Sequence, residues 1–150
     1  MRHIRVLVGL LLAVAFCPNP AKADGAVAVG LPANVAKEGV SIGVAINFDT
    51  ADAASADALK RCRNPGPTTV SGTPTTTKTG RLCKVYSSFH DQCYAYAFDP
   101  QDGTPGFGWA VADTTHDAEK EALGNCENTA GPGRRAACKV VKSGCDGTAK

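Results

Sequence analysis

The sequence has 150 residues, with sixteen Lys and Arg, fourteen Asp and Glu, and a formal net charge of +2 at pH 7. Arg2, Arg5 and Lys22 all lie in the first 23 residues, which contain no acid, so the rest of the chain has thirteen basic and fourteen acidic residues. No basic stripe remains, and this argues against nucleic acid as a partner, because its recognition rests on clustered Lys and Arg.

Residues 1–23 have the pattern of a secretory signal. A positive start and an apolar run lead to Ala21-Lys22-Ala23, an A-x-A site with cleavage expected before Asp24. The apolar run is shorter than the about 20 residues of a membrane span, so we expect a soluble exported product, periplasmic or extracellular. Cys17 offers the alternative of a lipid anchor, although Phe16 stands where such signals have a small residue.

The first half of the remaining chain is expected to form a hairpin and a closing strand. Residues 25–30 and 41–48 alternate small and larger apolar side chains, and Pro and Gly lie between them, as in two hairpin strands. Residues 84–87 are the closing strand. Residues 63–81 are rich in Thr, Pro and Gly, which predicts a surface loop inserted before that strand.

Two helices are expected, over residues 51–62 and about 115–126. Each carries a narrow stripe of small residues suited to close packing on a sheet: Ala51, Ala54, Ala58 and Cys62 in the first, Ala118, Ala122 and Cys126 in the second. The candidate caps are Asp49 or Thr50 for the first helix and Thr114 or Thr115 for the second.

The two halves repeat one pattern. Gly43-Val44-Ala45-Ile46 corresponds to Gly108-Trp109-Ala110-Val111, and the motifs A-L-x-x-C and C-K-V follow in both halves. Such a repeat organises the whole fold. We therefore expect an α+β domain over 24–150, made of two pseudo-repeated units, about 25–91 and 93–145. Each unit would have antiparallel strands and one helix.

Six cysteines follow the signal, and an even number in an exported chain indicates disulfides. Fifteen pairings are formally open, but the repeat requires equivalent roles for two of the pairs. The expected pairs are Cys62 with Cys83 and Cys126 with Cys138. Cys93 and Cys145 remain, each after a closing strand, and would lock the two units together.

These motifs carry a resemblance. The G-x-A strand, the A-L-x-x-C helix end, the C-K-V strand and the G-W-A strand resemble a family of small secreted bacterial proteins, from proteobacteria and mycobacteria, that is catalogued as a domain of unknown function. The resemblance spans about residues 24–145. It implies export, disulfides and an α+β fold, and it implies no catalytic residues.

Few residues suggest catalysis. Ser87, Ser88, His90 and Asp91 resemble the members of a Ser/His/Asp triad, but they are sequence neighbours in an expected turn, where polar groups are usual. His116 lies in the first turn of the second helix, where a capping or surface role is the stronger interpretation. We expect no catalytic residue among them.

Other carboxylates have structural explanations. Asp99 to Gly103 resembles a calcium loop, yet it lacks the repeated oxygen ligands, and a hairpin turn accounts for it. Asp49 and Asp113 are equivalent in the two units and could serve a hydrolase, but helix capping is the stronger interpretation. We expect no metal and no cofactor.

The most suggestive feature is a row of aromatic residues along two strands. The row consists of Tyr94, Tyr96, Phe98, Phe107 and Trp109. It is either buried between the two units, which is the default, or exposed as a binding face. The first functional hypothesis is a non-enzymatic module that binds a protein of the envelope or outside the cell, as an inhibitor or immunity-type protein. The alternatives are an envelope hydrolase that uses carboxylates, and a structural or stress-related secreted protein.

Overall fold

The computed structural model describes residues 23–64 and 77–150. The expected signal before Ala23, with Cys17, and most of the expected Thr- and Pro-rich loop lie outside these ranges. Within them the chain forms two three-stranded antiparallel sheets and four α-helices. This is the α+β fold that the sequence predicts.

The first sheet has β1 (Asp24–Gly30) at its centre, between β2 (Ser41–Phe48) and β3 (Lys84–His90). Helix α2 (Ala51–Arg63) connects β2 to β3 and packs on the sheet. The second sheet repeats this order. Its central strand is β4 (Cys93–Phe98), its flanking strands are β5 (Phe107–Ala112) and β6 (Lys139–Cys145), and its helix is α4 (Thr115–Ala130).

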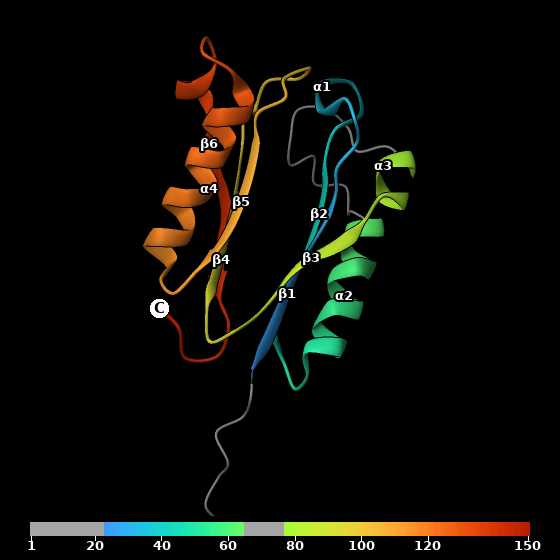
Figure 1. Cartoon of the computed structure of the whole chain (residues 1–150), viewed down its shortest axis with the longest axis vertical. Helices are drawn as coiled ribbons and strands as arrows, with labels where there is room; N and C mark the ends of the chain where they lie inside the picture. Colours follow the sequence, from blue (N-terminus) through green and yellow to red (C-terminus); the bar gives the residue numbers. More distant parts are fainter. Residues whose placement is uncertain (1–22, 65–76) are drawn as a thin grey trace, which may run out of the picture.

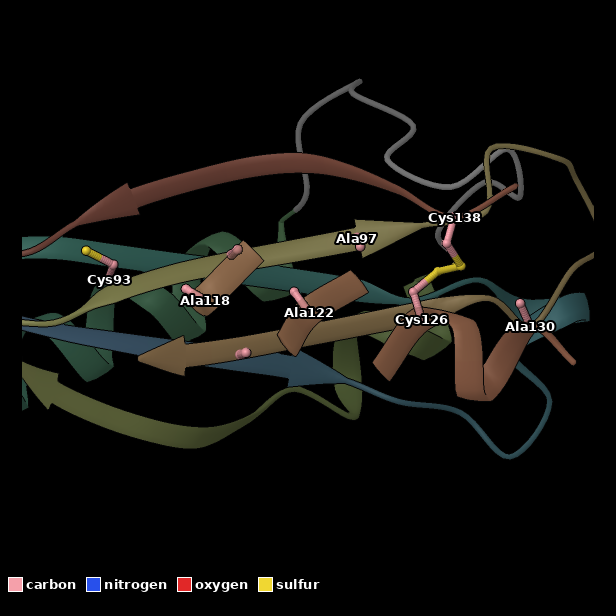
Figure 2. Close-up of a cluster of buried hydrophobic side chains, with 9 residues drawn as sticks. Cys93, Ala97, Ala118, Ala122, Cys126, Ala130 and Cys138 are labelled. Atoms are coloured by element: carbon pink, nitrogen blue, oxygen red, sulfur yellow. A yellow bond between two sulfur atoms is a disulfide. The ribbon is translucent and has the colours of Figure 1, made fainter. Parts of the chain in front are cut away.

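The elements stack in four layers. The two sheets face each other, with α2 on the outer face of the first sheet and α4 on the outer face of the second (Figure 1). Larger apolar side chains fill the space between the sheets, and alanines and cystines fill the space under each helix. Figure 2 shows this second kind of core, where Ala118, Ala122 and Cys126 of α4 face Ala97 of β4.

The repeated glycine of the G-x-A strands marks the closest approach of helix and sheet. A Cβ at Gly43 would collide with the carbonyl of Ala58 and the amide of Cys62 in α2. A Cβ at Gly108 would collide with the same two positions of α4, Ala122 and Cys126. The motif and the small-residue stripe are therefore two sides of one contact, in which the helix backbone lies directly on the strand.

Three disulfides join the elements in the pairs that the repeat predicts. Cys62–Cys83 and Cys126–Cys138 each tie the end of a helix to the residue before a closing strand, with Cα atoms 6.0 Å apart in both. Cys93–Cys145 links the start of β4 to the end of β6. This last bond lies within the second unit, whereas the sequence suggested a link between the two units. Both cysteines belong to paired strands of one sheet, where Cys93 lies opposite Cys145.

The caps and boundaries refine the predicted elements. The side chains of Thr50 and Thr114 accept the capping hydrogen bonds of α2 and α4, so Asp49 and Thr115 are not the caps. Helix α4 continues to Ala130, one turn past its predicted end.

Two short helices were not predicted. Helix α1 (Val35–Glu38) is capped by the side chain of Asn34, which accepts from the amide of Lys37 at 3.1 Å. Helix α3 (Thr77–Arg81) occupies the end of the expected loop, where the side chain of Thr79 donates to the carbonyl of Glu38 at 2.9 Å. A short 3-10 turn, η1 (Arg135–Ala137), follows α4.

Candidate functional site: a groove at the edge of β5

Among the described residues, no other strand covers one edge of β5, because β4 is its only partner in that part of the chain. Side chains of α4 bond part of this edge. The amide of Phe107 donates to Oγ1 of Thr129 at 2.9 Å, and Nδ2 of Asn125 donates to the carbonyl of Trp109 at 3.0 Å. Because alternate residues of a strand direct their backbone groups to the same side, Val111 also directs its amide and carbonyl outward.

Three backbone groups of this edge are therefore available. They are the amide of Trp109 and the amide and carbonyl of Val111, and no side chain in residues 23–64 or 77–150 bonds to them. Backbone donors and acceptors of this kind bond either to water or to an added strand.

A groove of about 630 Å³ runs along the same edge. It brings together elements of both units. Its walls include Ser87 of β3, Trp109 and Val111 of β5, and Glu121, Asn125 and Asn128 of α4. Glu121 is the one acidic or basic residue among these lining residues.

An aromatic pair stands beside the groove. The register of β1 and β3 shifts between Val27 and Ala28, which leaves Tyr86 as an extra residue of a bulge. Its side chain is 52% exposed, and its ring meets the ring of Trp109 edge-on, with centroids 6.1 Å apart. The bulge therefore places an exposed tyrosine next to the free edge of β5.

A second hollow, of about 430 Å³, adjoins the groove, because Phe107 and Thr129 line both. Its other lining residues come from the turn after β1, from α1 and from the β4–β5 connection, and they include Leu31, Pro32 and Pro105. This end is mainly apolar, and Leu31 is an exposed large hydrophobic residue. The second hollow therefore adjoins the groove as an apolar end.

The aromatic row of the sequence lies mostly between the sheets. Tyr94, Tyr96, Phe98 and Phe107 are buried there, and Trp109 is half-buried at the margin. Burial raises the pKa of the Tyr94 and Tyr96 phenols. Of the two alternatives, the structure has the buried row, and Phe107 and Trp109 are its two members that line the groove.

The Ser/His/Asp cluster does not have the geometry of a triad. Nδ1 of His90 lies 3.2 Å from a carboxylate oxygen of Asp24, and its Nε2 lies 3.2 Å from Asp91. Ser88 faces α2, where its hydroxyl is 3.4 Å from that of Ser55. The imidazole therefore bridges two carboxylates, and neither serine hydroxyl contacts it.

The other candidate residues also lie apart from one another and from the groove. The carboxylate of Asp99 is bonded by Arg134 and by the amide of Gln101, which makes it the anchor of a turn. Asp49, Asp113 and His116 are exposed and line neither hollow. In the described part of the chain, no group of three or more His, Cys, Asp or Glu side chains has the arrangement of a metal site.

Sequence reasoning missed most of the groove. Thr129 and Asn128 lie beyond the predicted end of the second helix, and Tyr86 gains its position from a bulge that has no sequence signature. Asn125 is the groove residue whose position the sequence pattern does indicate. It sits directly before Cys126 on the helix, so its side chain flanks the buried stripe at the margin of the sheet.

The comparisons with known proteins agree with the motifs. A family model described as "Domain of unknown function (DUF4189)" matches residues 25–145. No curated protein and no solved structure matches the chain. No helix within the described ranges is long and apolar enough to span a bilayer. Since the family model covers both units with all six paired cysteines, the chain belongs to the DUF4189 family.

Proposed function

We propose that this protein is exported to the cell envelope or beyond and there binds an extended segment of another protein, which adds as a strand to the free edge of β5. The observation that carries the proposal is the set of outward backbone groups at Trp109 and Val111. In strand addition these groups supply affinity, and pockets for alternate side chains supply specificity.

The groove has features that suit such a partner. Its polar wall on α4 and its aromatic pair on the opposite side would flank an added strand. The apolar end at Leu31, Pro32 and Pro105 would take a hydrophobic side chain of the segment. Glu121 lies about two turns before Thr129 on α4, so it favours a segment that carries Lys or Arg toward its other end, away from that side chain.

Export is supported by the residues before Asp24 and by the cystines. The signal pattern predicts cleavage before Asp24. Three disulfides persist in oxidising compartments and are rare in reducing ones. A cell-wall hydrolase or a toxin as partner would make the protein an inhibitor.

Two substitutions test the binding site directly. Val111→Pro removes the outward amide without removing a bond to β4, because proline is tolerated where the amide of an edge strand faces away from the sheet. Ser87→Arg fills the groove from β3. The matched controls are Val44→Pro, on the equivalent edge of β2 where the register with β1 is regular, and Ser88→Arg, on the neighbouring residue that faces α2.

The oxidised protein is used to capture partners from envelope and medium extracts, and the bound segment is then prepared as a synthetic peptide. We expect Val111→Pro to weaken peptide binding about tenfold, the equivalent of one net hydrogen bond, and Ser87→Arg to abolish it. Both controls should bind normally. In hydrogen exchange, the peptide should protect the amides of Trp109 and Val111. The proposal would be overturned if Val111→Pro bound the peptide as tightly as the wild type does. It would also be overturned if the peptide protected only amides on another surface.

A further inference from the structure

Asp146 follows β6 and joins the two units. Its side chain is fully buried (0% exposed), and its Oδ1 accepts a hydrogen bond from the amide of Asn47, 2.6 Å away. Its own amide donates to the carbonyl of Gln92 at 2.9 Å. No donor within the described ranges reaches its Oδ2. A buried carboxylate oxygen without a donor is costly, so this position calls for a partner that residues 23–64 and 77–150 do not supply.

The start of β1 lies beside this carboxylate. A Cβ on Gly147, the residue after Asp146, would lie 3.3 Å from the Cβ of Ala23, and Ala23 is itself buried. Asp24 lies opposite Phe48 in the β1–β2 register, next to the Asn47 that bonds Asp146. The peptide bond between Ala23 and Asp24, where cleavage is expected, therefore lies close to the Asp146–Gly147 segment that carries the unpaired oxygen.

Negative charge dominates the surroundings of this bond. The carboxylate of Asp24 contacts His90 on β3, and the carboxylate of Asp91 accepts from the amide of Thr148 at 3.1 Å. His90 thus links the carboxylates of Asp24 and Asp91, and Asp91 lies beside Gly147, the residue after Asp146. Three carboxylates and one imidazole therefore belong to the segments that meet at the start of β1. Such a field favours a cation.

We propose that cleavage before Asp24 creates the missing partner, and that the new α-ammonium of Asp24 pairs with the buried carboxylate of Asp146. A leader peptidase hydrolyses the bond with one water, so that Ala23 leaves with a carboxylate and Asp24 keeps its nitrogen as an ammonium. A single amide donor thus becomes three donors with a positive charge. This inference rests on the proposed cleavage and does not depend on the groove.

The test uses the full chain exported with its own leader, and the intact mass of the purified product identifies its first residue. After reductive methylation with a ¹³C label, NMR gives the pKa of the α-amino group. The variants are Asp146→Asn and, as control, Asp102→Asn in the exposed β4–β5 connection. A free α-amino group has a pKa of about 8. We expect a pKa at least about one unit higher in the wild type and in Asp102→Asn, and a return toward the ordinary value in Asp146→Asn.

Stability gives a second readout. Because the pKa would be raised in the folded state, the stabilisation is complete below about 8 and is lost as the pH rises through the folded-state value. The urea midpoint should fall in that window for the wild type and not for Asp146→Asn. A Gly inserted between Ala23 and Asp24 moves the ammonium by one residue, leaves Asp146 in place, and should have the same effect as Asp146→Asn.

The outcomes separate the two proposals. Equal α-amino pKa values in the wild type and in the Gly-insertion and Asp146→Asn variants would overturn the ion pair. An intact mass that still includes Ala23 would also overturn the ion pair, because Asp24 would then have no free α-ammonium. Neither result bears on peptide binding at β5.

Discussion

The carboxylate of Asp99 accepts two hydrogen bonds from the guanidinium of Arg134, at 2.7 Å from Nε and 2.6 Å from Nη2. The two residues join the β4–β5 connection to the segment after α4. The hydrogen bonds from Arg134 hold the pKa of the Asp99 carboxyl below its usual value, and they outweigh the opposite effect of its burial. The pair is therefore a source of acid sensitivity.

Arg134→Gln should destabilise the protein at neutral pH and raise the pH at which acid unfolds it. A lowered folded-state pKa contributes stability that is present above the unfolded value of about 3.9 and is lost as the pH falls through the folded value. Without the guanidinium, the buried carboxyl of Asp99 takes up its proton at a higher pH. Urea unfolding from pH 2 to 7 measures both effects. The exposed neighbour offers a control, Arg135→Gln, and an identical pH profile for both variants would contradict this account.

Gly43→Ala should destabilise the fold by about 1–3 kcal/mol, because the added methyl group forces the backbone of α2 away from β2. Gly124→Ala makes the same chemical change within α4, where a Cβ meets nothing within 4 Å. That variant should gain about 0.5–1 kcal/mol from helix propensity. Denaturant unfolding of the two variants should give free-energy changes of opposite sign. A neutral effect at Gly43 would show that the helix can move without cost.

Removal of the Cys93–Cys145 disulfide should cost more stability than removal of Cys126–Cys138. The first closes a separation of 52 residues and the second one of 12. The chain-entropy account assigns about 4 kcal/mol to the longer loop and about 3 kcal/mol to the shorter one. Each pair is replaced by two alanines, and the free energies of unfolding in urea are compared. The reverse order would mean that strain or local packing outweighs loop entropy.

Alkaline pH should unfold the protein through its inter-sheet core. Burial raises the pKa of Tyr94 and Tyr96 above the ordinary value of a phenol, so both remain protonated in the folded state at a pH where they ionise in the unfolded chain. Stability should accordingly decline as the pH rises above about 10. Ultraviolet titration follows the phenolates, and circular dichroism follows the fold. In Tyr96→Phe the decline should be smaller, whereas Tyr86→Phe, at an exposed position, should leave it unchanged.

Local patterns in the sequence predict the units better than their assembly. Gly43, Gly108 and the alanine stripes specify how each helix meets its sheet, because small residues there permit only close contact. The same motifs say nothing of how two sheets face each other. That arrangement follows from the total apolar surface of Tyr94, Phe98 and their neighbours, which can be buried in more than one way.

The candidate site shows which positions local sequence patterns do not predict. The sequence points to Trp109 by its aromatic side chain, whereas the groove depends on the backbone of Trp109 and on Tyr86, which a bulge places beside it. Asp146 had no motif at all, since its burial arises from contacts with Asn47, 99 residues earlier in the chain. Positions of this kind are set by tertiary structure, and only the folded chain reveals them.

The bulge of β3 has a counterpart in β6. There the register shifts between Tyr96 and Ala97, and the extra residue is Val141, 48% exposed. The duplicated framework thus has two equivalent edges, but Val44 and Val141 stand on one where Trp109 and Tyr86 stand on the other. Under the proposed function, only the aromatic edge carries the recognition chemistry. A chain built from two like halves would then be monovalent, and it would occupy a partner in a complex of one to one without cross-linking two.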